Sequence, residues 1–388
     1  MIRLFPYPVI NLMNHKATEQ FSRKKDVVYR MLTAKESRSI EWITQVAKEN
    51  NAKDIGLVEK TIRAFSLLES LARSGCPFIF KGGSCLMLHF NTSRRLSIDI
   101  DIVCPPGTDI EAYIGYLAEE YGFGEVKLVD RLSRDNVPKS HAKYYYEVAY
   151  GSQSRPDKIL LDVLFEENHY NDVVLLPIRS PFLKTEGEDI LVKVPSIADL
   201  LGDKLTAFAP HTTGIPFYKR ERDCSMEIIK QMYDIACLYD LTENLNPTDE
   251  TYDSLVVQEL GYRNLLDIGK EDVLQDTLNA AMNISTKGLL NIEEFQLYLN
   301  GITRIRGFIH SETYSLESAI RDSSKVAYIT ASIIKANKEL KHYHQDVAPA
   351  YQSAMIEQPF NTKLNKLKKT NFEAFYYWYE TYRLLQSI

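Results

Sequence analysis

The chain has 388 residues, of which 45% are hydrophobic and 25% charged, values that are ordinary for a globular protein. Its net charge of −6 excludes a globally basic nucleic-acid binder, although a local basic groove stays compatible with that charge. The five cysteines show no Cys-x-x-Cys pairing, so the sequence predicts neither a disulfide framework nor a zinc site.

Residues 1–74 are expected to form an N-terminal helical segment. Their start lacks a charged region followed by an apolar core, so we expect no signal peptide. No apolar run reaches the roughly 20 residues of a transmembrane helix, so we expect a cytoplasmic protein without a membrane segment. In residues 35–75 apolar side chains recur every three or four positions, which predicts two helices, the second ended by Gly75.

Residues 75–195 are predicted to form a mixed sheet with helices on one side. Apolar or alternating runs predict strands, at 76–81, 96–103, 126–133, 142–152, 157–167 and 192–194. Helical stretches are expected at 82–90 and 110–122. This region is the proposed catalytic core.

From residue 196 onward the period is helical, and Pro195-Ser196 is typical of a helix start. Further helices are predicted at 225–241, 256–267, 292–309, 323–340 and 371–388, with a loop at 211–224. The predicted fold class is therefore α+β, a mixed-sheet module followed by an α-helical module over 196–388.

A glycine turn and an acidic strand stand out in KGGSCLMLHFNTSRRLSIDID. Asp99 and Asp101 are two residues apart on a predicted strand, so their carboxylates share a face and repel each other unless a cation lies between them. Mg²⁺ commonly binds one or two carboxylates together with substrate phosphates. Backbone amides of Gly82 and Gly83, the Ser84 hydroxyl and the following helix N-terminus suit a phosphate. We infer a site for a metal-bound triphosphate.

Asp162 adds a third carboxylate within the apolar run DKILLDVLF, where it needs a partner. It is expected to bind metal or to act as general base on an attacking hydroxyl. Taken singly, the glycine turn is most often a plain turn, and each aspartate is most often solvated or paired with a cation. The order of the three features favours the shared site.

This series of motifs resembles the DNA polymerase β-like nucleotidyltransferases and, more narrowly, the AbiEii/AbiGii toxin family. The resemblance spans about residues 75–245 and rests on KGGSCLML, RRLSIDIDIV, KILLDVLF, ADLLGDKLTAF and KQMYDIACL. It implies that Lys81, Gly82, Gly83, Ser84 and Lys158 contact the nucleotide, and that Asp99, Asp101 and Asp162 bind metal. It also implies that Lys204 steadies the triphosphate and that Asp234 is the final acidic motif. Without the resemblance, a solvent-directed Lys204 and a helix-surface Asp234 stay open.

The resemblance implies a toxin that transfers a nucleotide from an NTP, with Mg²⁺ or Mn²⁺, to RNA, a tRNA 3′ end being the leading acceptor. It also implies a cognate antitoxin. Basic residues offer weak support for RNA, because solvated helix faces carry them too; they are Arg94, Arg95, 219–222, Arg304, Arg306, Lys335, Lys338, Lys341, Lys363, Lys366, Lys368 and Lys369. Transfer to a protein or small molecule, and a non-catalytic NTP-binding module, remain alternatives.

Overall fold

The computed structural model describes residues 32–90, 94–129, 137–150 and 156–386. Contacts divide the chain into two compact units. The sheet unit is Met1–Asn168 with Leu175–Val194, and the helical unit is His169–Val174 with Pro195–Ile388. Within the described ranges, no helix is long and apolar enough to cross a bilayer. Residues 1–31 of the predicted N-terminal segment and residues 130–133 of a predicted strand lie outside the described residues.

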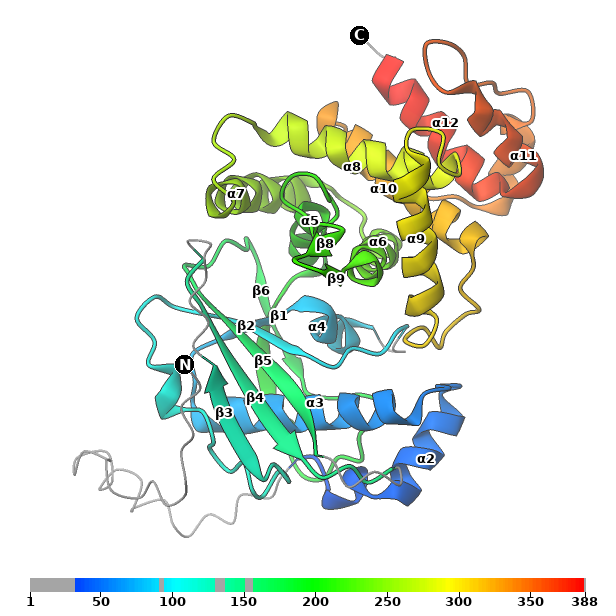
Figure 1. Cartoon of the computed structure of the whole chain (residues 1–388). Coiled ribbons are helices and arrows are strands. Elements are labelled where there is room, and N and C mark those ends of the chain that lie inside the picture. The colour runs from blue at the N-terminus through cyan, green and yellow to red at the C-terminus, as the bar shows by residue number, and fades with distance from the viewer. Residues whose placement is uncertain (1–31, 91–93, 130–136, 151–155, 387–388) are drawn as a thin grey trace. The chain divides into compact units, whose positions relative to one another are not determined.

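The sheet unit contains a five-stranded mixed sheet in the order β1-β2-β5-β4-β3, as the mixed-sheet prediction required (Figure 1). Strands β2 and β5 are parallel and the other neighbours are antiparallel. The strands are β1 (Ile79–Lys81), β2 (Ile100–Cys104), β3 (Glu125–Val129), β4 (Lys139–Tyr146) and β5 (Asp157–Phe165), and a separate pair is β6 (Val173–Pro177) with β7 (Leu191–Pro195). The helices are η1 (Lys35–Arg38), α2 (Ile40–Glu49), α3 (Ile55–Ser74), α4 (Gly82–His89) and η2 (Ile110–Ala112).

Alternation along the strands gives the sheet one apolar face. Helix α3 contacts β2 and β5 and runs along the sheet (Figure 1). Side chains that face this side are buried; they include Ile100, Ile102, Leu161, Val163, Ala142 and Tyr144. The residues between them on each strand point to the opposite face, and this is where the polar side chains of interest lie.

Helix α3 ends where the sequence predicts. At its start, the Asp54 carboxylate accepts a hydrogen bond from Leu57 N at 3.0 Å. At its end, Gly75 adopts φ +79°, the left-handed conformation that closes many helices. Local chemistry therefore sets both ends of the helix that supports the sheet.

One prediction of secondary structure is wrong, and two elements were missed. Residues 110–122, predicted as a helix, form only the short η2 and a series of turns, because Gly115 and Leu117 adopt positive φ angles of 87° and 51° that interrupt a helix. Strand β6 was not predicted. Helix α8 (Lys270–Ser285) was not predicted either.

The helical unit confirms the helical pattern predicted after residue 195. Its longer helices are α5 (Ile197–Ala207), α6 (Ser225–Tyr239), α7 (Asn246–Tyr262), α8, α9 (Ile292–Ile305), α10 (Leu316–Ile334) and α12 (Phe372–Gln386). Its short elements are η3 (Gln345–Tyr351), η4 (Thr362–Lys366) and α11 (Leu367–Thr370). The predicted loop 211–224 contains a small hairpin of β8 (Tyr218–Lys219) and β9 (Arg222–Asp223).

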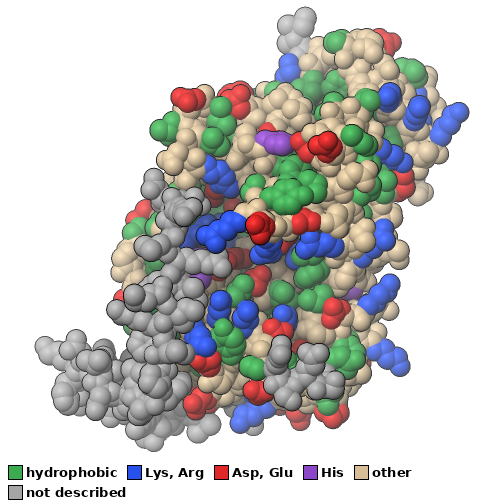
Figure 2. All heavy atoms as spheres, in the orientation of Figure 1, with side chains coloured by type: hydrophobic (Ala, Val, Ile, Leu, Met, Phe, Trp, Pro, Cys, Tyr) green, Lys and Arg blue, Asp and Glu red, His purple; other side chains and the backbone are tan. Residues whose placement is uncertain are grey.

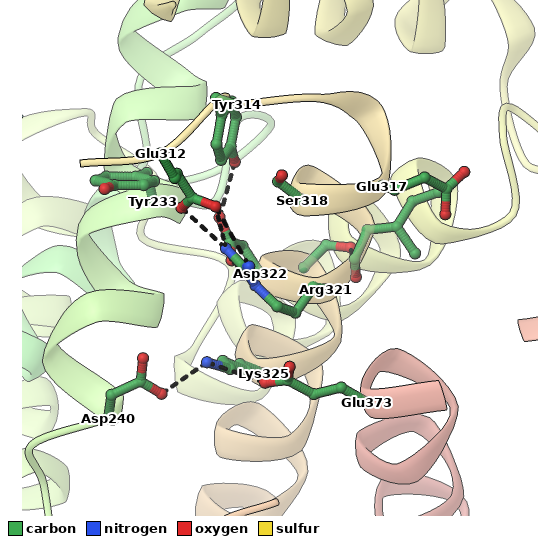
Figure 3. A network of polar contacts seen from close by, with 12 residues as sticks. Tyr233, Asp240, Glu312, Tyr314, Glu317, Ser318, Arg321, Asp322, Lys325 and Glu373 are labelled. Carbon is green, nitrogen blue, oxygen red and sulfur yellow. Dashed lines mark hydrogen bonds and ion pairs between the residues drawn. The ribbon is translucent and has the colours of Figure 1, made fainter. Parts of the chain in front are cut away.

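A charged network lies around α10, which packs against α6, α8 and α12 (Figure 3). Asp322 is buried, accepts a hydrogen bond from the Tyr314 hydroxyl at 2.9 Å, and pairs with Arg321 at 3.0 Å. One turn further along the helix, Lys325 pairs with Asp240 at 2.7 Å and with Glu373 at 3.3 Å. Side chains therefore link α10 to α6 and α12.

Candidate active site

The glycine turn after β1 brings the main chain against charged side chains. Gly82 has a φ of +79°, which favours glycine, and a Cβ there would lie 2.1 Å from Asp101 Oδ2. A Cβ on Gly83 would lie 2.5 Å from Arg95 Nη2. Position 82 therefore requires glycine, because of both its φ angle and the close approach of Asp101, whereas a side chain at position 83 would displace the end of Arg95.

Ser84 is buried, and its hydroxyl donates a hydrogen bond to the carbonyl oxygen of Asp99 at 2.5 Å. This bond ties the first turn of α4 to the segment that enters β2. The first amide N–H groups of α4 have no partners within their own helix, and such groups suit an anion. Because a serine hydroxyl has a single proton to donate, this bond competes with the phosphate contact predicted for Ser84.

Four polar side chains lie in register across β1, β2, β5 and β4, and we call them the polar row. Lys81 is opposite Asp101, Asp101 is opposite Asp162, and Asp162 is opposite His141. Residues paired in this way project from the same face of the sheet, and neighbouring strands are about 4.8 Å apart. The row thus brings together Asp101 and Asp162, which are far apart in the sequence.

In the polar row the two carboxylates are the inner pair, and Lys81 and His141 are the outer members. Asp162 Oδ1 lies 2.5 Å from His141 Nδ1, and since an ionised carboxylate only accepts, the imidazole N–H is the donor. The side chains of Asp162 and His141 are 42% and 21% exposed. Lys81 occupies the register position on the other side of Asp101. The two adjacent carboxylates in the middle still repel each other, which favours binding of a cation there.

The donor set of this region fits a divalent cation. The predicted strand 96–103 begins only at Ile100, so Asp99, half-buried, lies just before β2 and not on it, two residues before Asp101. All the candidate ligands are carboxylate oxygens, which Mg²⁺ prefers. In the part of the chain that the structure describes, no three or more His, Cys, Asp or Glu side chains are gathered into a ready-made metal cluster. Mg²⁺ commonly combines one or two carboxylates with substrate phosphates, and Asp101 with Asp162 suits that mode.

Sequence reasoning missed His141 and misjudged Arg95. His141 stands in an ordinary strand pattern, so only the pairing register of β4 with β5 reveals its neighbour. Arg95 was one of the basic residues that offered weak support for an RNA contact. It is buried instead, where its Nη1 donates a hydrogen bond to the Leu96 carbonyl at 3.0 Å, and it lies against Gly83.

Lys158 lies on the same face of β5 as Asp162 but four residues earlier, at the start of the strand. With a rise of about 3.3 Å per residue, the two Cα atoms are roughly 13 Å apart. Lys158 is exposed and is paired in register with Tyr145. The structure therefore does not bring Lys158 into the polar row.

Lys204 and Asp234 lie in the helical unit, where they form an ion pair between α5 and α6. Lys204 Nζ is 3.1 Å from Asp234 Oδ2, and it donates a hydrogen bond to Gln231 Oε1 at 2.9 Å. The two side chains are only 7% and 2% exposed. The buried ammonium thus has the anion that a buried charge needs, and that anion is the other predicted residue.

The family model described as nucleotidyl transferase AbiEii toxin, type IV TA system, matches residues 66–306. Comparison with curated proteins gave no match. A crystal structure of JHP933 from Helicobacter pylori is similar over 72% of this chain and 95% of that one, with 11% identity and a TM-score of 0.42. An antigenic nucleotidyltransferase-like protein from Paracoccidioides brasiliensis is similar over 55% and 91%, with 16% identity and a TM-score of 0.32.

Proposed function

The chain belongs to the AbiEii nucleotidyltransferase toxin family of type IV toxin–antitoxin systems, and we propose that it transfers a nucleoside monophosphate from an NTP to a tRNA 3′ end. The observation that carries the site assignment is the register of Asp101 with Asp162 beside the glycine turn. Two carboxylates fixed side by side next to a helix N-terminus suit a triphosphate that arrives with a divalent cation.

The reaction would join the acceptor 3′ oxygen to the α-phosphorus as the bond from that phosphorus to the bridging oxygen breaks, releasing pyrophosphate. The first N–H groups of α4 and the Lys81 ammonium would hold the phosphates. Asp99 and Asp101 would hold the cation, and Asp162 Oδ2 would accept the proton of the attacking hydroxyl. A bound Mg²⁺ would supply charge stabilisation for the phosphates and for the leaving pyrophosphate.

For Lys204 and Asp234, two proposals compete. The family resemblance implies that Lys204 contacts the triphosphate, whereas the buried ion pair favours a structural role for both residues. Measurements can separate the two proposals. Loss of a structural pair lowers the free energy of unfolding, whereas loss of a nucleotide contact lowers activity. Lys158 is proposed only as a peripheral nucleotide contact, because it is distant from the polar row along β5.

The proposal of an RNA acceptor depends mainly on the resemblance to the family and less on the surface of this chain. On the face in Figure 2, Lys and Arg side chains are interspersed with Asp and Glu. Several basic residues that were candidates for RNA contacts form ion pairs instead; these are Arg222 with Glu227, Arg304 with Asp223, Lys338 with Asp249 and Lys341 with Glu380. Exposed Lys219 and Arg220, in the β8–β9 hairpin, are better candidates for a phosphate backbone. A cytoplasmic location and an antitoxin partner complete the proposal.

The first test is an incubation of the purified protein with Mg²⁺, one labelled NTP at a time, and total tRNA. An Asp99→Ala variant is run beside the wild type. We expect label on tRNA with the wild type, none with the variant and none when EDTA removes the metal. Electrophoresis of RNA and protein separates the possible acceptors.

Label on protein or on a small molecule, with tRNA unlabelled, would replace the tRNA proposal by transfer to another acceptor. Absence of any label, with NTP binding intact by calorimetry, would favour the binding-only module. Equal labelling by the wild type and by Asp99→Ala would refute the assignment of the metal site.

A further inference from the structure

His141 is the one member of the polar row that the family resemblance does not assign to the reaction. It lies on β4, opposite Asp162 in the antiparallel pair β4–β5. Its Nδ1 is 2.5 Å from Asp162 Oδ1, so the two side chains are in direct contact. The contact holds Oδ1 of the Asp162 carboxylate, and Oδ2 makes no part of it.

The geometry around Asp162 is asymmetric. His141 lies on one side, on β4, and Asp101 lies on the other side, on β2. With Oδ1 turned toward the imidazole, Oδ2 is the oxygen that can accept a ligand or a proton. Because a carboxylate can rotate about its Cβ–Cγ bond, a donor that holds one oxygen decides where the other oxygen points.

A purely stabilising role is the alternative, and exposure argues against it. The Asp162 side chain is 42% exposed and that of His141 is 21% exposed. Pairs this accessible to water typically contribute little to stability. In contrast, hydrogen-bond partners of metal-binding groups commonly change metal affinity or activity by about 10–100-fold.

We propose that His141 is a positioning residue for nucleotidyl transfer: its Nδ1–H holds Asp162 Oδ1 and thereby directs Oδ2 toward the divalent cation and the acceptor hydroxyl. This inference rests on the proposed function. It extends the site from β1, β2 and β5 to β4, because His141 on β4 would act by orienting Asp162 on β5. Asp162 remains the group that touches the reactants.

Two substitutions separate positioning from bulk packing. His141→Leu removes the donor and keeps a side chain of similar size. His141→Asn keeps an N–H donor close to the position of Nδ1. A third variant, His169→Leu, removes an imidazole that contacts Ser254 Oγ at 3.0 Å in the helical unit, and it is the control for loss of a histidine elsewhere.

Two readouts are measured on the full chain. Electron paramagnetic resonance with Mn²⁺ alone gives metal binding without turnover, and the Mn²⁺ dependence of tRNA labelling gives the half-saturating concentration. We expect His141→Leu to raise the dissociation constant for Mn²⁺ and the half-saturating Mn²⁺ concentration by about 10-fold or more. For His141→Asn we expect both values to stay within about 3-fold of the wild type. Thermal unfolding should change little in either variant.

The inference is overturned if His141→Leu binds Mn²⁺ and labels tRNA like the wild type. It is also overturned if His141→Asn fails as badly as His141→Leu. Failure of the proposed function is a different result, since the wild type itself would then label no tRNA. In that case the Mn²⁺ binding of the two variants still decides whether His141 positions a metal-binding carboxylate.

Discussion

Charged side chains occur in two contrasting settings in this protein. On the sheet, the polar row is accessible to water, and its central carboxylates are placed next to each other. In the helical unit, the side chains of Lys204, Asp234, Asp322 and Lys325 are buried, and each has an oppositely charged partner. The contrast fits the proposed function, because carboxylates placed side by side and open to water suit a cationic ligand, whereas a buried charge needs an opposite partner.

The largest expected effect is on activity in the polar row. Asp101→Asn removes a proposed ligand of the cation and should lower the rate of tRNA labelling by on the order of 10³-fold, since charge stabilisation by a metal is worth several kcal/mol. Its free energy of unfolding should stay the same or rise slightly, because repulsion with Asp162 disappears. Labelling kinetics and urea unfolding measure the two quantities. An Asp101→Asn variant that labels tRNA like the wild type would contradict the proposed role of the polar row in binding the cation.

The next effect is on stability in the helical unit. Asp234→Asn leaves the Lys204 ammonium buried without its counterion and should lower the free energy of unfolding by about 3–5 kcal/mol. The double variant Lys204→Met with Asp234→Leu, which removes both charges, should recover most of that loss. Urea unfolding of the single and double variants is the measurement. An Asp234→Asn variant with unchanged stability and no activity would instead favour a direct role of the Lys204–Asp234 pair in the reaction.

A smaller effect concerns pH. Burial raises the pKa of Asp322 to about 6, against the opposing charges of Arg321 and Lys325. The folded protein therefore binds this proton more tightly than the unfolded chain, so the free energy of unfolding should fall as pH rises from about 4 to 6 and then level off. For this group alone the fall amounts to about 3 kcal/mol.

Asp322→Asn isolates that contribution, because it keeps an acceptor for the Tyr314 hydroxyl and cannot ionise. The difference in unfolding free energy between the wild type and Asp322→Asn, measured at intervals from pH 4 to 7, should change across this window and be constant above it. A difference that does not vary with pH would mean that Asp322 is not the titrating group.

Local patterns in the sequence predicted much of the fold. Gly75 at the end of α3 and the glycine turn at Gly82 are positions where one residue's backbone freedom decides the conformation. The failure at residues 110–122 has the same origin, since the pattern of apolar residues there is helical while Gly115 and Leu117 adopt positive φ angles. Periodicity describes which side chains would share a face, and it cannot exclude a break in the backbone.

The site was harder to predict than the strands that carry it. Asp99, Asp101 and Asp162 attract notice because a carboxylate among apolar residues needs a partner. The contact of Asp162 with His141 depends on a cross-strand register, and the pairing of Lys204 with Asp234 depends on how two helices pack. Neither is encoded in a local pattern, because both join residues that are distant along the chain.

The parallel pairing of β2 with β5 has a consequence for biosynthesis. Asp101 and Asp162 meet only after the whole connection between them, including β3 and β4, has been made and has folded back onto β2. Such non-local pairing is slow compared with helix formation. A nascent chain that ends before β5 lacks half of the central carboxylate pair. On the proposed function, the carboxylate pair therefore cannot form until β5, the last strand of the five-stranded sheet along the chain, has been made.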